Sequence, residues 1–489
     1  EASYFSKSIT ADELKEALYI YASDDFQGRE TGTPGQKKAV EYLKNYYMSL
    51  GVPAAKSDGN YFQDVPLQKM GAPDMTLKIG DNDYEMIDDY VSVDDGEDGV
   101  ITSEDFAYVG YGIESDKYSS YTDVDVTGKF VLMKAGEPKN ADGNFVVSGS
   151  DQTSLWSTNQ QFIVKRQIAL SKGAKGILFY APQIYQFVAL QYGKGGGQIS
   201  LKGDSPTEKL YYLFVNSSIA KDLVEDIDTN DTSKLIDTSI NFTFKSNTKE
   251  LSSENVAAFI KGSEKPEEII VISSHLDHEG MKGDDIYNGA DDDGSGSVAM
   301  LEIAEAFKAA IDNGQAPKRS ILFLHVTGEE KGLLGSRYYT DSDPIFPLEN
   351  TVVNLNIDMI GRSDPKRTEG DRNYVYVIGS DKLSTELHNL SEEVNKKCCT
   401  VEFDYKYNDI NDPNRFYYRS DHYNFAKNNI PVIFYFNGTH ADYHKPSDTP
   451  DKIEYDLLEN RARLIFHTAW ELANRENRIV VDKLEEKAE

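Results

Sequence analysis

The stretch from Val271 to Met300, VISSHLDHEGMKGDDIYNGADDDGSGSVAM, joins an apolar run to an acidic loop and then to a helical pattern. The apolar run Ile269–Ile272 is too short for a helix and predicts a buried strand. Beyond the loop, apolar residues recur at helical spacing from Val298 to Ile311. Open α/β sheets place ligand sites at this position, outside the carboxyl ends of their strands. The histidine and carboxylates found there suit a borderline cation such as zinc.

Length and charge limit the possible classes of protein. The 489 residues are enough for two or three domain-sized units. The 51 basic and 82 acidic residues give a formal net charge of −31. Such a surface argues against nucleic acid or an anionic membrane as a partner, although solubility alone would also explain it. No apolar run is long enough to span a membrane.

The only cysteines are the adjacent pair Cys398 and Cys399, so neither a disulfide framework nor a thiolate zinc site is expected. We expect two ordinary thiols at a helix end. The chain begins at Glu1 without a methionine and shows no signal peptide, which predicts that an N-terminal segment was removed.

The pattern of elements changes twice along the chain. Residues 1–90 contain two helical patterns, the second starting at Thr33-Pro34-Gly35. Residues 91–245 alternate short strands with turns and place few histidines or carboxylates at strand ends, so we expect an inserted accessory domain. Residues 246–489 repeat strand, loop and helix, which predicts an α/β sandwich with a largely parallel sheet. The expected strands are 256–260, 269–272, 321–325, 352–357, 374–378 and 432–436, and the expected helices are 297–311, 382–397 and 455–474.

Residue types that bind metals follow four of these strands. A single aspartate at a strand end is usually a helix cap or a surface charge, and a single histidine is usually a packed polar residue. Several of them at one edge of one sheet are much harder to explain in that way. The set comprises His275 with Asp277, Glu329 with Glu330, Asp358, His444 and, from the acidic loop, Asp292.

A hydrolase with two metal ions needs a bridging carboxylate, further ligands for each ion and a free base, with the ions about 3.5–4 Å apart. Five residues could be the ligands: His275, Asp292, Glu330, Asp358 and His444. Glu329 then remains for proton transfer, because neighbouring residues in an extended turn point in different directions. Asp277 is placed to hold the second nitrogen of His275. Neither His278 nor His440 is needed as a ligand, and we expect both near the rim of the site, with His325 in the core.

These motifs resemble the zinc-dependent exopeptidases of peptidase clan MH, which include bacterial leucyl aminopeptidases and glutamate carboxypeptidase II. The resemblance implies a three-layer α/β sandwich with a mostly parallel central sheet. Residues 106–180 are similar, more loosely, to the protease-associated domain that some members carry as an insert, and residues 28–35 resemble an N-terminal segment that packs on the catalytic domain. The segments that resemble the catalytic part are His275–Asp277, Gly289–Gly296, Gly328–Gly335, Asn356–Gly361 and Asp442–Thr449.

The resemblance also implies a role for each residue. His275 and Asp358 would bind one zinc ion, Glu330 and His444 would bind the other, and Asp292 would bridge them. Glu329 would be the general base and acid, acting with a hydroxide held between the ions. Tyr443 would polarise the scissile carbonyl group. The peptide bond between Asp292 and Asp293 would be cis.

The favoured function is therefore a co-catalytic dizinc aminopeptidase that removes N-terminal residues from peptides. A carboxypeptidase or dipeptidase on the same scaffold stays open, because the metal ligands do not separate the two. A mononuclear glutaminyl cyclase would not need a second metal site. A non-catalytic relative, such as the transferrin receptor, would be expected to have lost ligands. The resemblance to secreted members further predicts an extracellular or periplasmic location.

Two other enzyme classes fit poorly. Gly294–Ala299 matches the dinucleotide pattern G-x-G-x-x-G/A, but the three aspartates before it would repel a pyrophosphate. The chain has no G-x-S-x-G motif of a serine hydrolase. Side-chain preference, oligomeric state, calcium binding at the acidic loop and the role of the insert are not predicted.

Overall fold

The computed structural model describes residues 2–93, 97–193, 197–204 and 210–484. The chain forms two compact units. Unit 1 combines the residues up to Pro66 with those from Ser252 onward, and unit 2 comprises Leu67–Leu251. The motifs predicted to bind metal all lie in unit 1.

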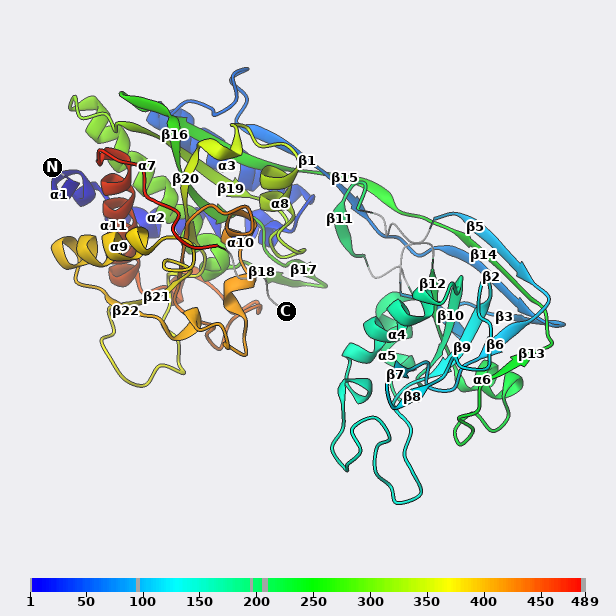
Figure 1. Cartoon of the computed structure of the whole chain (residues 1–489). Coiled ribbons are helices and arrows are strands. Elements are labelled where there is room, and N and C mark those ends of the chain that lie inside the picture. Colours follow the sequence, from blue (N-terminus) through cyan, green and yellow to red (C-terminus); the bar gives the residue numbers. More distant parts are fainter. Residues whose placement is uncertain (1, 94–96, 194–196, 205–209, 485–489) are drawn as a thin grey trace. The chain divides into compact units, whose positions relative to one another are not determined.

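A large mixed sheet runs through unit 1 (Figure 1). Its central strands are apolar runs, as expected for strands that are covered on both faces. Every residue of β19 (Arg319–Val326) and β20 (Thr351–Ile357) is buried. In unit 1 the strands follow the order β1 (Phe62–Lys69), β15 (Lys249–Ile260), β19 (Arg319–Val326), β16 (Lys265–His275), β20 (Thr351–Ile357), β23 (Val432–Phe436), β21 (Tyr374–Ile378) and β22 (Glu402–Asp404).

The four central strands, β19, β16, β20 and β23, are parallel neighbours. The register places Ile272 of β16 opposite Phe323 on one side and Leu355 on the other. The flanking strands β15 and β21 run antiparallel to their inner neighbours. The expected parallel sheet is therefore confirmed at its centre, while the sheet as a whole is mixed.

Helices cover both faces of this sheet, so unit 1 has three layers (Figure 1). Successive side chains of β16 point to opposite faces. Ile270 and Ile272 pack in one core with α2 (Ala11–Tyr21), α3 (Pro34–Leu50), α7 (Gly296–Asp312), α9 (Thr385–Cys398) and α11 (Tyr455–Asn474). Ile269 and Val271 pack in the other core with α8 (Leu334–Asp341) and α10 (His422–Ala426).

Helix α3 illustrates how local sequence sets these boundaries. Thr33 accepts a hydrogen bond from the backbone N–H of Gln36, and Pro34 occupies the first turn, where no intrahelical donor is needed. The helix ends at Gly51, whose φ of 73° is the left-handed conformation that glycine adopts without steric cost. The cap predicted at Thr33 is confirmed.

Unit 2 is a smaller, β-rich α/β unit. One sheet has the order β13 (Lys234–Ile236), β6 (Phe106–Tyr108), β9 (Phe130–Lys134), β10 (Gly176–Tyr180), β12 (Tyr211–Val215) and β4 (Tyr90–Ser92). A second sheet has the order β3 (Asn82–Tyr84), β2 (Asp74–Ile79), β14 (Ile240–Lys245) and β5 (Gly99–Ser103). Helices α4 (Gln160–Ser171), α5 (Tyr185–Tyr192) and α6 (Ser217–Leu223) complete it, and β11 (Ile199–Leu201) pairs with Leu67–Lys69.

The division between the units differs from the expected boundaries at residues 90/91 and 245/246. Strand β2 pairs with β14 along its whole length, and its inward residues Leu77 and Ile79 belong to the core of unit 2. The segment from Leu67 to residue 90 therefore belongs to the insert rather than to the catalytic part.

The expectation of free thiols at Cys398 and Cys399 is wrong for this structure. The two residues form a disulfide between neighbours at the end of α9. In the described part of the chain, no helix is both long and apolar enough to cross a membrane.

Candidate metal centre

The predicted ligands gather at the carboxyl ends of the four parallel strands. His275 is the last residue of β16, and Asp358 directly follows β20. Glu329 and Glu330 follow β19, and His444 lies in the loop after β23. Because these strands are parallel neighbours, their carboxyl ends meet at one edge of the sheet. The predicted convergence is confirmed by the distances between the side chains.

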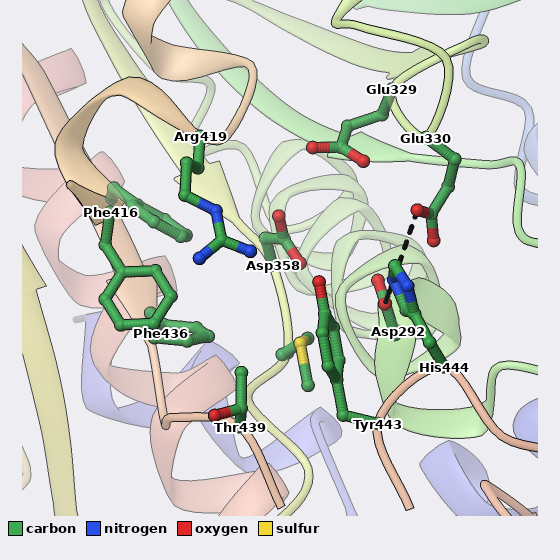
Figure 2. Close-up of a pocket in the computed structure, with 12 residues that line it drawn as sticks. Asp292, Glu329, Glu330, Asp358, Phe416, Arg419, Phe436, Thr439, Tyr443 and His444 are labelled. Carbon is green, nitrogen blue, oxygen red and sulfur yellow. Dashed lines mark ion pairs between the residues drawn. The ribbon is translucent and has the colours of Figure 1, made fainter. Parts of the chain in front are cut away.

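Asp292 lies between two groups of side chains. Its Oδ1 is 3.1 Å from Nε2 of His275, and its Oδ2 is 3.0 Å from Nε2 of His444. On the first side, Nε2 of His275 is also 3.5 Å from Oδ1 of Asp358. On the second side, Nε2 of His444 is 3.2 Å from Oε2 of Glu330 (Figure 2). A single carboxylate thus reaches one nitrogen of each group, as a bridging ligand must.

The backbone around Asp292 is held by neighbouring carboxylates. Asp448 accepts hydrogen bonds from the backbone N–H groups of Asp291 and Asp292 at 3.1 and 3.2 Å. Asp293 accepts from the backbone N–H groups of His275 and Met359 at 3.2 and 3.1 Å. The peptide bond between Asp292 and Asp293 is cis, as expected.

Asp277 holds the site in a way that differs from the prediction. Its carboxylate Oδ1 lies 3.8 Å from Nδ1 of His275, too far for a hydrogen bond. Instead, the backbone carbonyl oxygen of Asp277 lies 2.9 Å from that nitrogen. The carboxylate accepts hydrogen bonds from the backbone N–H groups of Glu329 at 3.1 Å and Glu330 at 3.4 Å, and from the hydroxyl of Thr31 at 2.9 Å. It therefore orients the glutamate pair rather than the imidazole.

The N-terminal segment is part of this support. The buried guanidinium group of Arg29 donates hydrogen bonds to the carbonyl oxygens of Leu276, Asn288 and Gly289 at 3.1, 2.7 and 3.0 Å. These carbonyls belong to the two segments that present His275 and Asp292. The expected packing of residues 28–35 on the catalytic part is confirmed.

The electrostatics of the site follow from four carboxylates in a small buried space. Burial raises the pKa of Glu329 well above its usual value. Burial would also raise the pKa of Glu330, but His278 and His444 outweigh it and lower that pKa to about 2. For Asp292 burial acts in the same direction, and contacts with His275 and His444 hold the pKa well below the usual range.

The donor set fits bound cations. Among the described residues, Asp292, Glu329, Glu330 and Asp358 form ion pairs with histidines only. Nε2 of His275 and Oε1 of Glu330 are buried and make no hydrogen bond of normal geometry within the described part of the chain. Buried carboxylates are normally paired or coordinate metals, and nitrogen and oxygen donors of this kind suit zinc.

A pocket opens in front of these residues, and its lining changes from acidic to aromatic (Figure 2). Asp292, Glu329, Glu330, Asp358 and His444 line the acidic side. The hydroxyl of Tyr443 and the guanidinium group of Arg419 both point into the pocket in Figure 2. The remaining lining residues are mostly apolar and comprise Met359, Phe416, Phe434, Phe436 and Thr439.

Two histidines lie elsewhere than expected. His278 is 0% exposed rather than at the rim, and its Nδ1 is 2.8 Å from Oε1 of Glu330. His440 is also buried, with Nε2 hydrogen-bonded to Asp291 at 3.1 Å. The only signal in the sequence was position, since His278 lies three residues after His275. His325 is in the core, as expected, between Tyr47 and Ser274.

Comparison with known proteins finds similar sequences among metallopeptidases. Residues 255–469 match the model of peptidase family M28. This segment is therefore similar to the peptidases of that family. Among curated relatives, the aminopeptidase YwaD of Bacillus subtilis is 31% identical over 159 residues, which are 29% of this chain and 33% of that protein. A probable glutamate carboxypeptidase of Zea mays is 30% identical over 121 residues, covering 25% of this chain and 16% of the relative.

The fold is that of M28 aminopeptidase structures. The aminopeptidase from Aneurinibacillus sp. strain AM-1 superimposes with a TM-score of 0.55 at 20% sequence identity, and the match covers 100% of both chains. This likeness concerns the fold. By sequence, the chain spans between 16% and 57% of the length of the curated relatives that it matches.

Proposed function

We propose that the protein is a zinc aminopeptidase with two metal ions. The observation that supports this most directly is the position of Asp292, whose two carboxylate oxygens face His275 and His444 at 3.1 and 3.0 Å. His275, Asp358 and Asp292 would hold one ion, and Glu330, His444 and Asp292 the other. Two zinc ions there would polarise the scissile carbonyl and activate a water molecule.

Glu329 is the residue best placed to move the proton. Its carboxylate lines the pocket and lies 3.9 Å from Nε2 of His275, which is too far for a hydrogen bond. Because burial raises its pKa, the carboxyl group can accept and release a proton closer to neutral pH than an ordinary glutamate can. It would take a proton from water and give it to the leaving amine.

Tyr443 is suited to donate a hydrogen bond to the oxygen of the carbonyl group under attack. Burial, together with the nearby carboxylates of Asp292 and Glu330, raises the pKa of its phenol, so the hydroxyl keeps its proton. A donor aimed at the developing oxyanion stabilises the transition state more than the ground state.

Charge favours the N-terminus of a peptide as the group bound beside the glutamates. The carboxylates at the acidic side of the pocket attract a substrate ammonium group and repel a substrate carboxylate. Arg419 favours a second candidate, a carboxypeptidase or dipeptidase, because its guanidinium group lines the same pocket and could bind a terminal carboxylate.

A panel of peptides separates these two candidates. An aminopeptidase cleaves C-amidated peptides and not N-blocked ones, a carboxypeptidase shows the opposite pattern, and a dipeptidase cleaves neither. The panel should be run beside zinc analysis of the purified protein, with activity removed by a chelator and restored by zinc. Full activity in a protein stripped of metal would overturn the proposal.

We also propose that the enzyme acts outside the cytoplasm. The support is the resemblance to secreted members alone. Fractionation of the source cells, with activity and antibody detection in each fraction, would test it; enzyme found only with cytoplasmic markers would contradict it.

A further inference from the structure

His278 occupies a fixed and fully enclosed position beside the metal centre. The residue is 0% exposed, and its backbone N–H donates to the carbonyl oxygen of Arg29 at 3.3 Å. Its ring lies against the backbone of Gly289, where a Cβ atom would come within 2.5 Å of the ring carbon Cγ. Gly289 therefore leaves the space that the imidazole fills.

Neither ring nitrogen of His278 has a hydrogen-bond partner within the described part of the chain. Nδ1 nevertheless lies 2.8 Å from Oε1 of Glu330, an oxygen that also makes no hydrogen bond, and 3.8 Å from Oδ2 of Asp292. Buried polar atoms are normally satisfied, so Nδ1 of His278 and Oε1 of Glu330, which face each other beside the Asp292 carboxylate, call for a common partner.

The spacing of these atoms suits a cation. His278, Asp292 and Glu330 each offer a donor atom, and the three atoms lie within 4.8 Å of one another. Zinc ligands at roughly 2.0–2.2 Å from the ion are separated from one another by about 3–4 Å in a tetrahedral arrangement.

We propose that His278 is a direct ligand, through Nδ1, of the cation held by Asp292 and Glu330. This inference rests on the proposed metal-dependent function. It gives one ion three buried protein ligands, with His444 approaching from the pocket side, where its side chain is 34% exposed. The other ion keeps only His275, Asp292 and Asp358 as protein ligands.

The two ions would then differ in strength of binding. An ion with four protein ligands would be held more tightly than an ion with three, and it could still take up a shared water, because catalytic zinc can become five-coordinate. The ion beside His278 would be the tightly bound one, and the ion beside His275 the exchangeable one.

The test compares zinc content and affinity in purified full-length variants. His278→Asn retains a hydrogen-bond donor near Glu330 but no good metal ligand, and His278→Cys restores a ligand of a different kind. His388→Ala, on α9 away from the centre, is the matched control. After dialysis against a competing chelator, the wild type and H388A are expected to keep the ion that H278N loses. The zinc affinity of H278N is expected to be lower than that of the wild type on the order of a hundredfold.

The absorption of the cobalt-substituted protein gives a second readout that does not depend on turnover. Replacement of a ligand changes the visible spectrum of bound Co²⁺, and H278C is expected to add a thiolate band. A residue that merely supported Glu330 would weaken binding and leave the cobalt spectrum in place. Thermal unfolding of the metal-free proteins checks that the variants are folded.

The possible outcomes separate the two proposals. Wild-type protein without bound zinc would overturn the proposed function itself. Wild type with two zinc ions, combined with H278N that binds both with unchanged affinity and spectrum, would overturn only the role of His278. A wild type with a single ion would contradict the two-ion proposal, and the role of His278 would then be decided by whether H278N loses that ion.

Discussion

The backbone carbonyl oxygen of Asp277 lies 2.9 Å from Nδ1 of His275. A carbonyl oxygen can only accept a hydrogen bond, so Nδ1 carries the proton and Nε2 keeps its lone pair. Nε2 is the nitrogen that faces Asp292 and Asp358 at 3.1 and 3.5 Å. The main chain thus selects the tautomer that a metal ligand requires, and the Asp277 carboxylate is left free to hold the glutamate loop.

Replacing Asp277 by asparagine should reduce turnover more than metal content. The amide NH₂ group would face a backbone N–H of Glu329 or Glu330, so one hydrogen bond would become a repulsion. We expect kcat to fall about 10- to 100-fold, with zinc still bound at His275. Thr31→Val removes only one of the contacts to Asp277 and should have a smaller effect. Loss of the zinc ion in D277N would mean that the carboxylate acts on His275 after all.

Glu329→Gln should retain zinc and lose most of the turnover. The amide keeps the size of the side chain but cannot transfer a proton, so kcat should fall about 10²- to 10⁴-fold. The assay is hydrolysis of aminoacyl-arylamides, with zinc measured in the same samples. Glu302→Gln is the control, because Glu302 is a buried carboxyl that bonds to Tyr46 outside the pocket. Normal hydrolysis by E329Q would remove Glu329 from the mechanism.

Tyr443→Phe should lower kcat about 10²- to 10³-fold and change KM little, as expected for a donor that acts in the transition state. Kinetics on one peptide substrate, with zinc content checked, give both constants. Tyr405→Phe removes a hydroxyl that bonds to Glu392 far from the pocket lining and should behave as wild type. A rise in KM alone would instead assign Tyr443 to substrate binding.

Binding of zinc to the metal-free protein should release protons at pH 8. Burial would lower the pKa of His444, but Asp292 and Glu330 outweigh it and raise that pKa to about 10. His444 is therefore protonated at pH 8 without metal, and it must lose this proton to coordinate zinc. A pH indicator in weakly buffered solution counts the protons. His444→Ala should release about one proton fewer per chain, and equal release would place His444 outside the metal centre.

Arg29→Lys should destabilise unit 1 and weaken zinc retention together. Lysine keeps the charge but cannot reach several carbonyl oxygens with a planar fork, and buried carbonyls left without donors cost about 1–3 kcal/mol of unfolding free energy. Urea unfolding and zinc content measure the two effects. Arg478→Lys is the control, since Arg478 also donates to two carbonyls, those of Glu349 and Thr351, but with one bond at the surface. Unchanged stability in R29K would contradict the role of the Arg29 hydrogen bonds in stabilising unit 1.

The sequence was sufficient for the centre of the sheet and for the set of side chains that meet at its edge. Apolar runs such as 321–325 are typical of buried strands. Once those strands are parallel neighbours, the metal-binding residue types at their carboxyl ends meet at one edge of the sheet. It did not show that Leu77 and Ile79 belong to unit 2, because strand pairing over long sequence distances is not visible in a local pattern. The sequence also predicted His278 at the rim, whereas the residue is buried. Its burial depends on the space that Gly289 leaves for the imidazole ring, and a local sequence pattern does not show that space.

The discontinuity of unit 1 determines the order in which the chain can fold during synthesis. Arg29 leaves the ribosome early, but its carbonyl partners at Leu276, Asn288 and Gly289 follow only after the whole of unit 2 has been made. Domains generally fold as units while the chain emerges. Unit 2 can therefore be complete while residues up to Pro66 still wait for the second half of their sheet, and a nascent chain that stalls before residue 290 exposes the apolar faces of α2 and α3 to chaperones or to neighbouring chains.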